Sequence, residues 1–481
     1  MQFSSIFSPA AERPVVAALL GCGEFGLSLI AQTRRVAGLR IVAALDLDTA
    51  RVSANLVADG VPHRRCEGPA DIRAAVAAGE VALTSRIDDL LATPGLELVV
   101  EATGHPEGAA RHALAAIAAG KHVAMVSKES ECVVGPLLAA KARSAGLSYT
   151  LVEGDQPALL VILMSWARVL GLPILAAGKS SEYDYVFDPA TGRTRWLTEE
   201  VDSPEIATLM ALGDDVAGTV AARAAALAGL PQRTVPDYCE MALVANATGM
   251  PIGLPEFYAP LARTPELPQL YGLRAQGGLL ERTGVIDVFN CLRRPDEASF
   301  AGGVFVIVEL ADRRTGELFA GKGIPVSRDR RRAMIYNPSH LLGVEAPISV
   351  MAAGRLGHSV PDAGYRPVVD LVARAARDLP AGHAIKIEGN RHAVPGLDAL
   401  LLLTAPASGG APVPYYLAVG QRLRRSVSAG ALIVCDDLDI PADSLLWQLR
   451  AEQDVTFPCA GRQAARAAPS GLSHSEDSLN A

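Results

Sequence analysis

The segment Pro14-Val-Val-Ala-Ala-Leu-Leu-Gly-Cys-Gly-Glu-Phe-Gly26 decides the fold that we expect for this chain. Its apolar first half predicts a buried strand over 14–20, which runs into a helix predicted over 24–35. The turn between them, Gly21-Cys-Gly-Glu-Phe-Gly26, matches the pattern GxGxxG. The first glycine makes the tight turn, the second lets a pyrophosphate approach the backbone, and the third lets helix and strand pack closely. The segment therefore predicts a dinucleotide-binding turn, whose cofactor-binding residues are Gly21, Gly23, Glu24, Phe25 and Gly26.

The cofactor expected at this turn is NAD, with NADP as the second choice. Asp46 stands at the end of a predicted strand over 40–45, about 20 residues after Gly26. A carboxylate at that place can accept a hydrogen bond from the ribose 2′-hydroxyl and would repel a 2′-phosphate. Arg51 follows closely and weakens the preference. Thr103 and Gly104 end a further predicted strand, so we expect them to line the nicotinamide half of the pocket.

Strands and helices alternate regularly through the first third of the chain. Helices are predicted over 107–119 and 135–145, and strands over 98–100, 122–126 and 148–152. This alternation predicts an α/β fold, in which a doubly wound parallel sheet of the Rossmann type occupies residues 14–178.

The rest of the chain predicts two smaller units and a tail. Residues 179–360 mix strand-like runs with long Gly- and Pro-rich stretches, which indicates a central α+β domain for substrate binding and dimerisation. Residues 361–450 contain an internal repeat, because 378–385 and 426–433 both read as a turn followed by an apolar strand. The repeat predicts a small, pseudo-symmetric β domain. Residues 458–481 are typical of a disordered tail.

Composition and hydropathy argue against two classes of partner. The 481 residues carry a formal net charge of −8, whereas nucleic-acid-binding proteins usually present a basic surface, so we expect no nucleic-acid partner. The apolar stretch 157–178 is long enough to span a bilayer, but Arg168 and Pro173 interrupt it. We therefore predict a buried helix over 158–170 and a buried strand over 174–177, and no membrane partner.

Cysteine usage and the first residues indicate a compartment. The seven cysteines are scattered and form no CxxC pair, which favours a reducing cytoplasm and argues against a disulfide framework or a zinc site. The stretch 1–14 has neither a basic start nor an adequate apolar core, so it does not predict a signal peptide. We therefore expect a cytoplasmic protein whose principal mechanism uses no metal.

Polar residues that follow predicted strands mark the candidate reaction site. Lys128 follows one strand, Glu153 and Asp155 follow the next, and Lys179 ends another. The carboxyl ends of parallel strands meet at the edge of the sheet where ligands bind. A lysine there can polarise a carbonyl group or donate its proton, and a carboxylate can orient a hydroxyl group. These four residues are the predicted catalytic residues.

The order of motifs along the chain resembles a known group of enzymes. The series runs from GxGxxG through Glu101-Ala-Thr-Gly104, Gly154-Asp-Gln-Pro157 and Glu240-Met-Ala-Leu-Val-Ala-Asn-Ala-Thr-Gly249 to Pro338-Ser-His-Leu341. It is similar to that of homoserine-dehydrogenase-like oxidoreductases with a C-terminal SAF (β-clip) domain, a group that includes the deoxyxylulose phosphate reductoisomerase-like enzymes. The resemblance implies NAD(P)-dependent oxidation or reduction of a small hydroxy or oxo compound, in a homodimer or homotetramer. It also places Glu129, Asn246 and His340 in the substrate pocket.

One departure from that group bears on the substrate. Where relatives read Arg-Pro-Tyr-His, this chain reads Asn337-Pro-Ser-His340, which puts a phosphorylated substrate in doubt. The leading hypothesis is therefore a NAD-preferring dehydrogenase with a small-molecule substrate. A second hypothesis is a sugar-phosphate reductoisomerase with a divalent metal near Glu153 and Asp155. A third is a dinucleotide-binding sensor or assembly protein that does not turn over a substrate.

Overall fold

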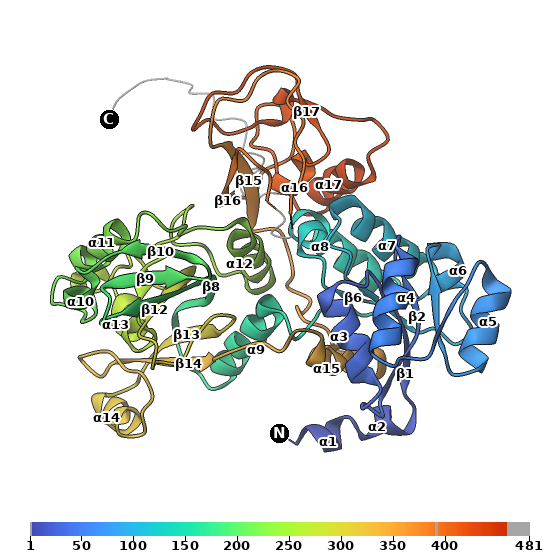
Figure 1. Cartoon of the computed structure of the whole chain (residues 1–481), viewed down its shortest axis with the longest axis horizontal. Coiled ribbons are helices and arrows are strands. Elements are labelled where there is room, and N and C mark those ends of the chain that lie inside the picture. Colours follow the sequence, from blue (N-terminus) through green and yellow to red (C-terminus); the bar gives the residue numbers. More distant parts are fainter. Residues whose placement is uncertain (1, 390–392, 459–481) are drawn as a thin grey trace, which may run out of the picture.

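The computed structural model describes residues 2–389 and 393–458, and Figure 1 shows them arranged in three parts. The N-terminal part is built on one sheet and the middle part on a second. The C-terminal part packs on helices of the N-terminal part, at the top of the view. Of the predicted disordered tail, only Pro458 falls within the described residues.

The first sheet has seven parallel strands and confirms the predicted Rossmann-type fold. Its spatial order is β3-β4-β2-β1-β5-β6-β7, and its two outermost strands on the β2 side were not predicted. The chain crosses from one side of β1 to the other before β5, which creates a switch point where ligands bind in such sheets. The strands are β1 (Val15–Leu20), β2 (Leu39–Leu45), β3 (His63–Arg65), β4 (Val81–Thr84), β5 (Leu98–Glu101), β6 (His122–Met125) and β7 (Tyr149–Leu151).

Both faces of this sheet are buried under helices. Within β1, Ala17 and Leu19 join one hydrophobic cluster, and Ala18 and Leu20 join another. A strand buried on both faces reads as a continuous apolar run, which explains the sequence of β1. The helices of the N-terminal part are α1 (Phe3–Ile6), α2 (Ser8–Glu12), α3 (Glu24–Thr33), α4 (Thr49–Ala58), α5 (Pro69–Ala77), α6 (Ile87–Leu91), α7 (Pro106–Ala118) and α8 (Lys128–Ser144), and α15 (Ala346–Met351), from much later in the chain, packs against α3 and β2.

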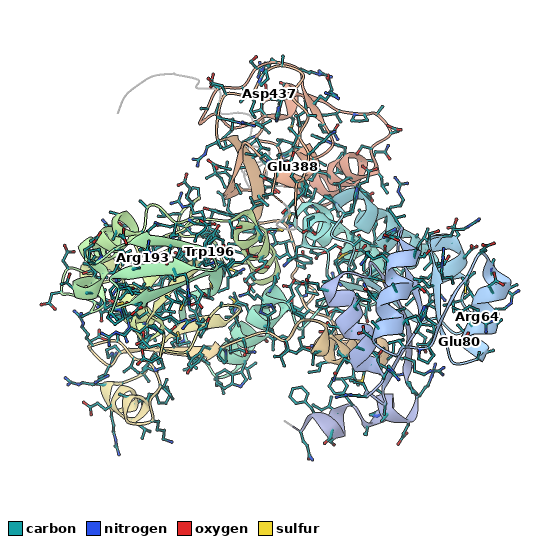
Figure 2. The ribbon with its side chains drawn as sticks, in the orientation of Figure 1. Arg64, Glu80, Arg193, Trp196, Glu388 and Asp437 are labelled. Carbon is teal, nitrogen blue, oxygen red and sulfur yellow. The ribbon has the colours of Figure 1, made fainter. Side chains whose placement is uncertain are left out.

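The outer edge of the first sheet is polar. Strand β3 lies at that edge and carries Arg64, whose Nε donates to Glu80 Oε2 at 2.8 Å. Figure 2 labels this pair on the outer side of the N-terminal part. Charged side chains on an edge strand oppose pairing with another chain, so we expect no sheet extension there.

The second sheet is organised around the long strand β8 (Ile174–Asp188). Strand β12 (Val285–Arg293) runs parallel to β8, and β13 (Val304–Glu309) and β9 (Arg193–Trp196) run antiparallel to it. The predicted strand over 174–177 therefore begins at the right residue but ends far too early. The predicted N-terminal unit over 14–178 also extends too far, because its last residues already belong to this second sheet.

The middle part completes the sheet with short strands and surrounds it with helices. The remaining elements there are α9 (Gln156–Val169), β10 (Glu199–Asp202), α10 (Ile206–Leu209), α11 (Val216–Ala226), α12 (Val235–Thr248), β11 (Leu261–Ala262), α13 (Leu267–Leu270), α14 (Arg313–Gly321) and β14 (Arg332–Asn337). The mixed strand directions agree with the predicted α+β character. In the part of the chain that the structure describes, no helix is long and apolar enough to cross a bilayer.

The C-terminal part contains the predicted internal repeat as a pair of matching segments. Leu379 and Val427, which hold equivalent places in the two copies, exchange both backbone hydrogen bonds at 2.9 Å. The Ala381 amide donates to Ser426 Oγ at 3.2 Å, and the equivalent Ala429 amide donates to Asp378 Oδ1 at 2.8 Å. The two copies are thus related by a local pseudo-twofold axis. The elements of this part are β15 (Val369–Ala375), β16 (Leu397–Leu403), α16 (Tyr415–Ala418), β17 (Arg422–Leu423), β18 (Leu438–Asp439) and α17 (Leu445–Thr456).

A side chain of α17 replaces backbone hydrogen bonds that are missing from α8. Pro136 lies inside α8, where its ring opens the helical hydrogen-bond ladder. The buried Gln453 fills the opening, because its Nε2 donates to the Val133 carbonyl at 2.8 Å and its Oε1 accepts from the Leu137 amide at 3.2 Å. The C-terminal part therefore completes the backbone hydrogen bonding of a helix in the N-terminal part.

We predict that Gln453→Ala lowers the free energy of unfolding by about 2–4 kcal/mol, because two buried backbone groups lose their partners. Urea unfolding and hydrogen exchange at the Leu137 amide measure the effect. The matched control is Gln448→Ala on the exposed face of the same helix, which should change little. Equal stability of the two variants would contradict this role for Gln453.

Candidate active site

The glycine turn has the shape that a bound dinucleotide requires. Gly21 has φ +90°, and a Cβ there would come within 2.5 Å of the Ala102 carbonyl oxygen. A Cβ at Gly26 would come within 2.4 Å of the Gly21 carbonyl oxygen. A Cβ at Gly23 would meet nothing within 4 Å, so the backbone there is open at the N-terminus of α3. The turn is therefore closed on its packed side and open where a pyrophosphate would approach.

Asp46 is held beside this turn, at the end of β2. Its Oδ2 accepts from the Cys22 amide at 2.9 Å and from Arg51 at 3.1 Å. Arg51 also donates to the Cys22 carbonyl at 3.3 Å. The carboxylate is thus positioned for a ribose hydroxyl, and a cation stands next to it. This arrangement fits NAD. The charge of Arg51 partly offsets the repulsion between Asp46 and a 2′-phosphate, so the preference over NADP is reduced.

Thr103 and Gly104 follow β5, next to β1. Thr103 Oγ1 donates to Glu101 Oε1 at 2.6 Å, and the Gly104 amide donates to Ser127 Oγ at 2.8 Å. These bonds tie the end of β5 to the loop after β6. The two residues lie at the switch point, although they do not line the cavity described next.

A cavity of about 330 Å³ opens at the carboxyl ends of the first sheet. It receives side chains from the N-terminal part, the middle part and the C-terminal part. Its lining residues are Glu24, Phe25, Val126, Lys128, Glu129, Gly154, Asp155, Glu182, Pro236, Cys239, Leu342 and Tyr416. Because the glycine turn and the end of β6 contribute to one wall, the cavity adjoins the place where the nicotinamide end of a dinucleotide would lie.

Glu240 of α12 joins two lysines at the back of the cavity. Its Oε1 accepts from Lys128 Nζ at 2.6 Å, and its Oε2 accepts from Lys179 Nζ. Lys128 also donates to Asp155 at 3.3 Å, and Lys179 Nζ forms an ion pair with Asp237 Oδ1 at 2.9 Å. The five groups form one chain of alternating charges, buried at Lys179, Asp237 and Glu240 and partly exposed at Lys128 and Asp155, that links α8, β8, α12 and the loop before α9.

The electrostatics of this chain keep its lysines charged. Burial acts against the ammonium form of Lys128, but Asp155 and Glu240 outweigh it and hold its pKa well above the usual range. Burial likewise opposes the charge of Lys179, and Asp237 and Glu240 raise its pKa. Burial opposes the Glu240 carboxylate too, yet the two lysines lower its pKa to about 2. Burial raises the pKa of Asp155.

Five predicted site residues line the cavity, and they come from separate predictions. Lys128, Glu129 and Asp155 were expected in the reaction site, and Glu24 and Phe25 at the cofactor turn. Lys179 does not end a strand as predicted, because it lies within β8. Lys179 is only 1% exposed and does not line the cavity. It is linked to Lys128, which does, because both lysines bind Glu240. The lysine stays in the strand because two carboxylates of α12 neutralise it there.

Besides Lys179, three further residues predicted for the reaction site or the substrate pocket lie outside the cavity lining. Glu153 bonds to Ser349, whose Oγ accepts from the Glu153 amide at 2.8 Å and donates to Glu153 Oε2 at 3.0 Å. The ring of His340 contacts the Gly302 carbonyl at 2.9 Å. Asn246 does not face a substrate, because its Oδ1 accepts from the Val368 and Val369 amides at 2.7 and 2.9 Å. That side chain instead anchors the start of β15 to α12.

Sequence reasoning missed Asp237, Glu240, Glu182 and Tyr416. Asp237 and Glu240 stand three residues apart, a spacing that puts both carboxylates on one face of a helix. Glu240 also begins the motif in which Asn246 was chosen, so a signal was present. Glu182 follows Lys179 on β8, and no signal in the sequence indicated that Tyr416 would reach this cavity.

The described residues contain no group of three or more His, Cys, Asp and Glu side chains that could hold a metal ion. The carboxylates nearest to such a role already have other partners, since Asp155 and Glu240 bind Lys128. Their arrangement fits an ammonium group better than a divalent cation.

Comparison with known proteins gives two matches to family models. Residues 21–151 match the model described as homoserine dehydrogenase, NAD binding domain. Residues 234–346 match the model described as oxidoreductase DRL, catalytic domain. The first match covers the sheet with the glycine turn, and the second contains α12 with Asp237 and Glu240.

Individual proteins are similar to this chain at lower levels. A 1-deoxy-D-xylulose 5-phosphate reductoisomerase of Cupriavidus metallidurans is 27% identical over 327 residues, which cover 62% of this chain and 75% of that protein. A solved DOX-P reductoisomerase with fosmidomycin and magnesium is 15% identical, with 48% and 57% of the two chains covered and a TM-score of 0.29. The WlbA dehydrogenase of Bordetella pertussis, solved with NADH and UDP-GlcNAcA, is 21% identical, with 35% and 48% covered and a TM-score of 0.24. The chain thus spans about half the length of these two solved chains.

The two family matches confirm the predicted resemblance to homoserine-dehydrogenase-like oxidoreductases. The protein is a nicotinamide-dinucleotide-binding oxidoreductase, related to reductoisomerases of the deoxyxylulose phosphate type and to dehydrogenases. The predicted SAF identity of the C-terminal part stays a prediction.

We predict that Asp46→Ala weakens NADH binding about tenfold or more, because the ribose loses a charged hydrogen-bond acceptor. NADPH binding should strengthen, since a negative charge near the 2′-phosphate is removed. Fluorescence titration with each dinucleotide measures both dissociation constants. Asp59→Ala removes an exposed carboxylate elsewhere in the same part and should change neither. Equal weakening of both dinucleotides would contradict the role of Asp46 in cofactor choice.

Proposed function

We propose that this protein is a NAD-preferring oxidoreductase that transfers hydride between nicotinamide and a small, unphosphorylated hydroxy or oxo compound bound in the 330 Å³ cavity. One observation carries the proposal. Lys128, the cation that a carbonyl reaction needs, lies in that cavity next to the dinucleotide-binding turn and is fixed by Glu240. The match to a homoserine dehydrogenase NAD-binding domain supports the reaction type.

In this mechanism Lys128 polarises the substrate oxygen. When bound, the nicotinamide ring supplies or accepts the hydride. Lys128 remains protonated because its pKa is held high, so it stabilises negative charge that develops on the oxygen during carbonyl reduction and can pass its proton to it. Asp155, which binds Lys128, would orient the substrate hydroxyl. Lys179 acts through Glu240 and is a positioning residue in this scheme.

The charge of the cavity supports an unphosphorylated substrate. Four acidic residues line it, namely Glu24, Glu129, Asp155 and Glu182. Lys128 is the one lysine among the lining residues, which include no arginine, and two carboxylates already bind it. Phosphate recognition normally uses arginine or lysine donors that are free to bind it. The lining would therefore repel a phosphate group. This agrees with the sequence at 337–340, where Asn337 stands in place of the arginine of the related enzymes.

A second candidate function is a sugar-phosphate reductoisomerase. The relative of that name in Cupriavidus metallidurans, which matches 62% of this chain, favours it. This function would place a divalent metal near Glu153 and Asp155. The proposed cytoplasmic location and homo-oligomeric state fit either function.

We predict that Lys128→Met lowers kcat about 10²–10⁴-fold while NADH binding remains intact, because proton donation and charge stabilisation are lost. Steady-state NADH oxidation with a panel of oxo acids, semialdehydes and sugar phosphates provides the assay. The control is Lys322→Met, which removes an exposed lysine after α14 and should leave turnover unchanged. Full turnover by Lys128→Met would rule out this mechanism. An absence of NADH oxidation across the panel by the unaltered protein would favour the sensor hypothesis.

We also predict that treatment with EDTA leaves the rate of NADH oxidation unchanged, because Asp155 in the lining and Glu240 behind it already bind lysines. The rate is measured before and after chelation, with and without added Mg²⁺ or Mn²⁺. Loss of activity on chelation and its recovery with either metal would support the reductoisomerase instead.

A further inference from the structure

Among the described residues of the C-terminal part, Tyr416 of α16 is the one that lines the cavity. We infer that Tyr416 is a specificity-determining residue, which sets the size limit of the substrate that the cavity accepts. This inference rests on the proposed function, because it takes the cavity as the substrate site.

Tyr416 forms a wall between two cavities. On one side it lines the 330 Å³ cavity together with Lys128, Glu129 and Cys239. On the other side it lines a cavity of about 470 Å³ between α7 and the C-terminal part. It is the one residue common to the linings of these two cavities, and its side chain is only 1% exposed. Removing its ring would therefore join the two spaces.

The second cavity can receive polar groups of a longer substrate. Gln421 and Trp447 belong to its lining. Gln421 is 8% exposed, and its Oε1 has no hydrogen-bond partner within the described residues; the same holds for Trp447 Nε1. Buried polar groups normally have partners. The unmatched acceptor and the unmatched donor are buried in the wall of the second cavity, so a hydroxyl or amide group, which can both donate and accept, would pair with them once these side chains turn towards it.

The wall is fixed and does not swing as a gate. The Tyr415 hydroxyl accepts from the Val394 amide at 2.8 Å, and its ring packs edge-on against Tyr416 with centroids 5.2 Å apart. The residues just before α16 are held by strand pairing, since the Val413 amide donates to the Ile433 carbonyl at 2.9 Å. The position of Tyr416 is therefore set by the fold of the C-terminal part.

The Tyr416 hydroxyl stays neutral at this place. Burial raises its pKa, and the neighbouring Cys239 and Glu129 raise it further. A neutral phenol adds no charge to the acidic cavity, so its removal changes the size of the cavity more than its electrostatics.

The test compares Tyr416→Ala with Tyr416→Phe on a series of straight-chain 2-oxo acids and aldehydes of increasing length, with NADH as the cofactor. In the unaltered protein kcat/KM should fall once the chain exceeds the cavity. In Tyr416→Ala the ratio of kcat/KM for long over short substrates should rise about tenfold or more. Tyr416→Phe keeps the ring and should keep the original length profile. Leu403→Ala is the control, because it removes an exposed apolar side chain elsewhere in the C-terminal part, and it should also keep that profile.

The outcomes separate this inference from the proposed function. An unchanged length profile in Tyr416→Ala, or an equal change in Tyr416→Phe, would overturn the role of Tyr416 as a size limit. If Tyr416→Ala does not fold, Tyr416→Trp replaces it and should shorten the longest accepted substrate while NADH binding is retained; an unchanged limit would overturn the inference. If the unaltered protein turns over no substrate, the proposed function fails. Calorimetric binding of the corresponding hydroxy acids and alcohols to the NADH-loaded variants then gives the same length test.

Discussion

The carboxylate of Glu240 stands between two ammonium groups, the buried one of Lys179 and the partly buried one of Lys128, and the arrangement of the candidate active site depends on it. Each lysine would be a costly buried charge without this shared partner, and removal of one member of such a group usually costs several kcal/mol. Because Lys128 begins α8, Lys179 lies within β8 and Glu240 belongs to α12, this interaction fixes the first sheet against the second. The cavity lies between these elements, so its shape follows from one charge network.

The first sheet could be predicted from the sequence because its signals are local. The strand 14–20, the glycine turn and the alternation up to Leu151 needed only patterns of neighbouring residues. Strands β3 and β4 were missed because they are short, and β3 carries two exposed arginines at the sheet edge. The length of β8 was missed for a different reason. A lysine within an apolar strand normally indicates its end, and only the carboxylates of α12 make Lys179 tolerable there.

The candidate site was predictable where it follows strand ends and not where it depends on distant helices. Lys128 and Asp155 were found because they follow β6 and β7 in the chain. Glu240 was not predicted as a site residue, because a glutamate in a helix normally indicates an exposed charge and the sequence does not show its two lysine partners. Asn246 reads as a site residue in the same motif, yet its amide bonds only to the backbone at β15. Tyr416 could not be assigned, since it arrives from a separate part of the fold.

The insertion of Gln453 into α8 has a consequence for the timing of protein synthesis. The Leu137 amide is made 316 residues before the side chain that binds it. At 5–20 residues per second, this interval lasts roughly 15–60 s. Throughout that time the helix that starts with Lys128 lacks part of its backbone hydrogen bonding. A growing chain therefore carries this helix long before it can complete it, and the opening between Val133 and Leu137 is closed only after translation has passed α17.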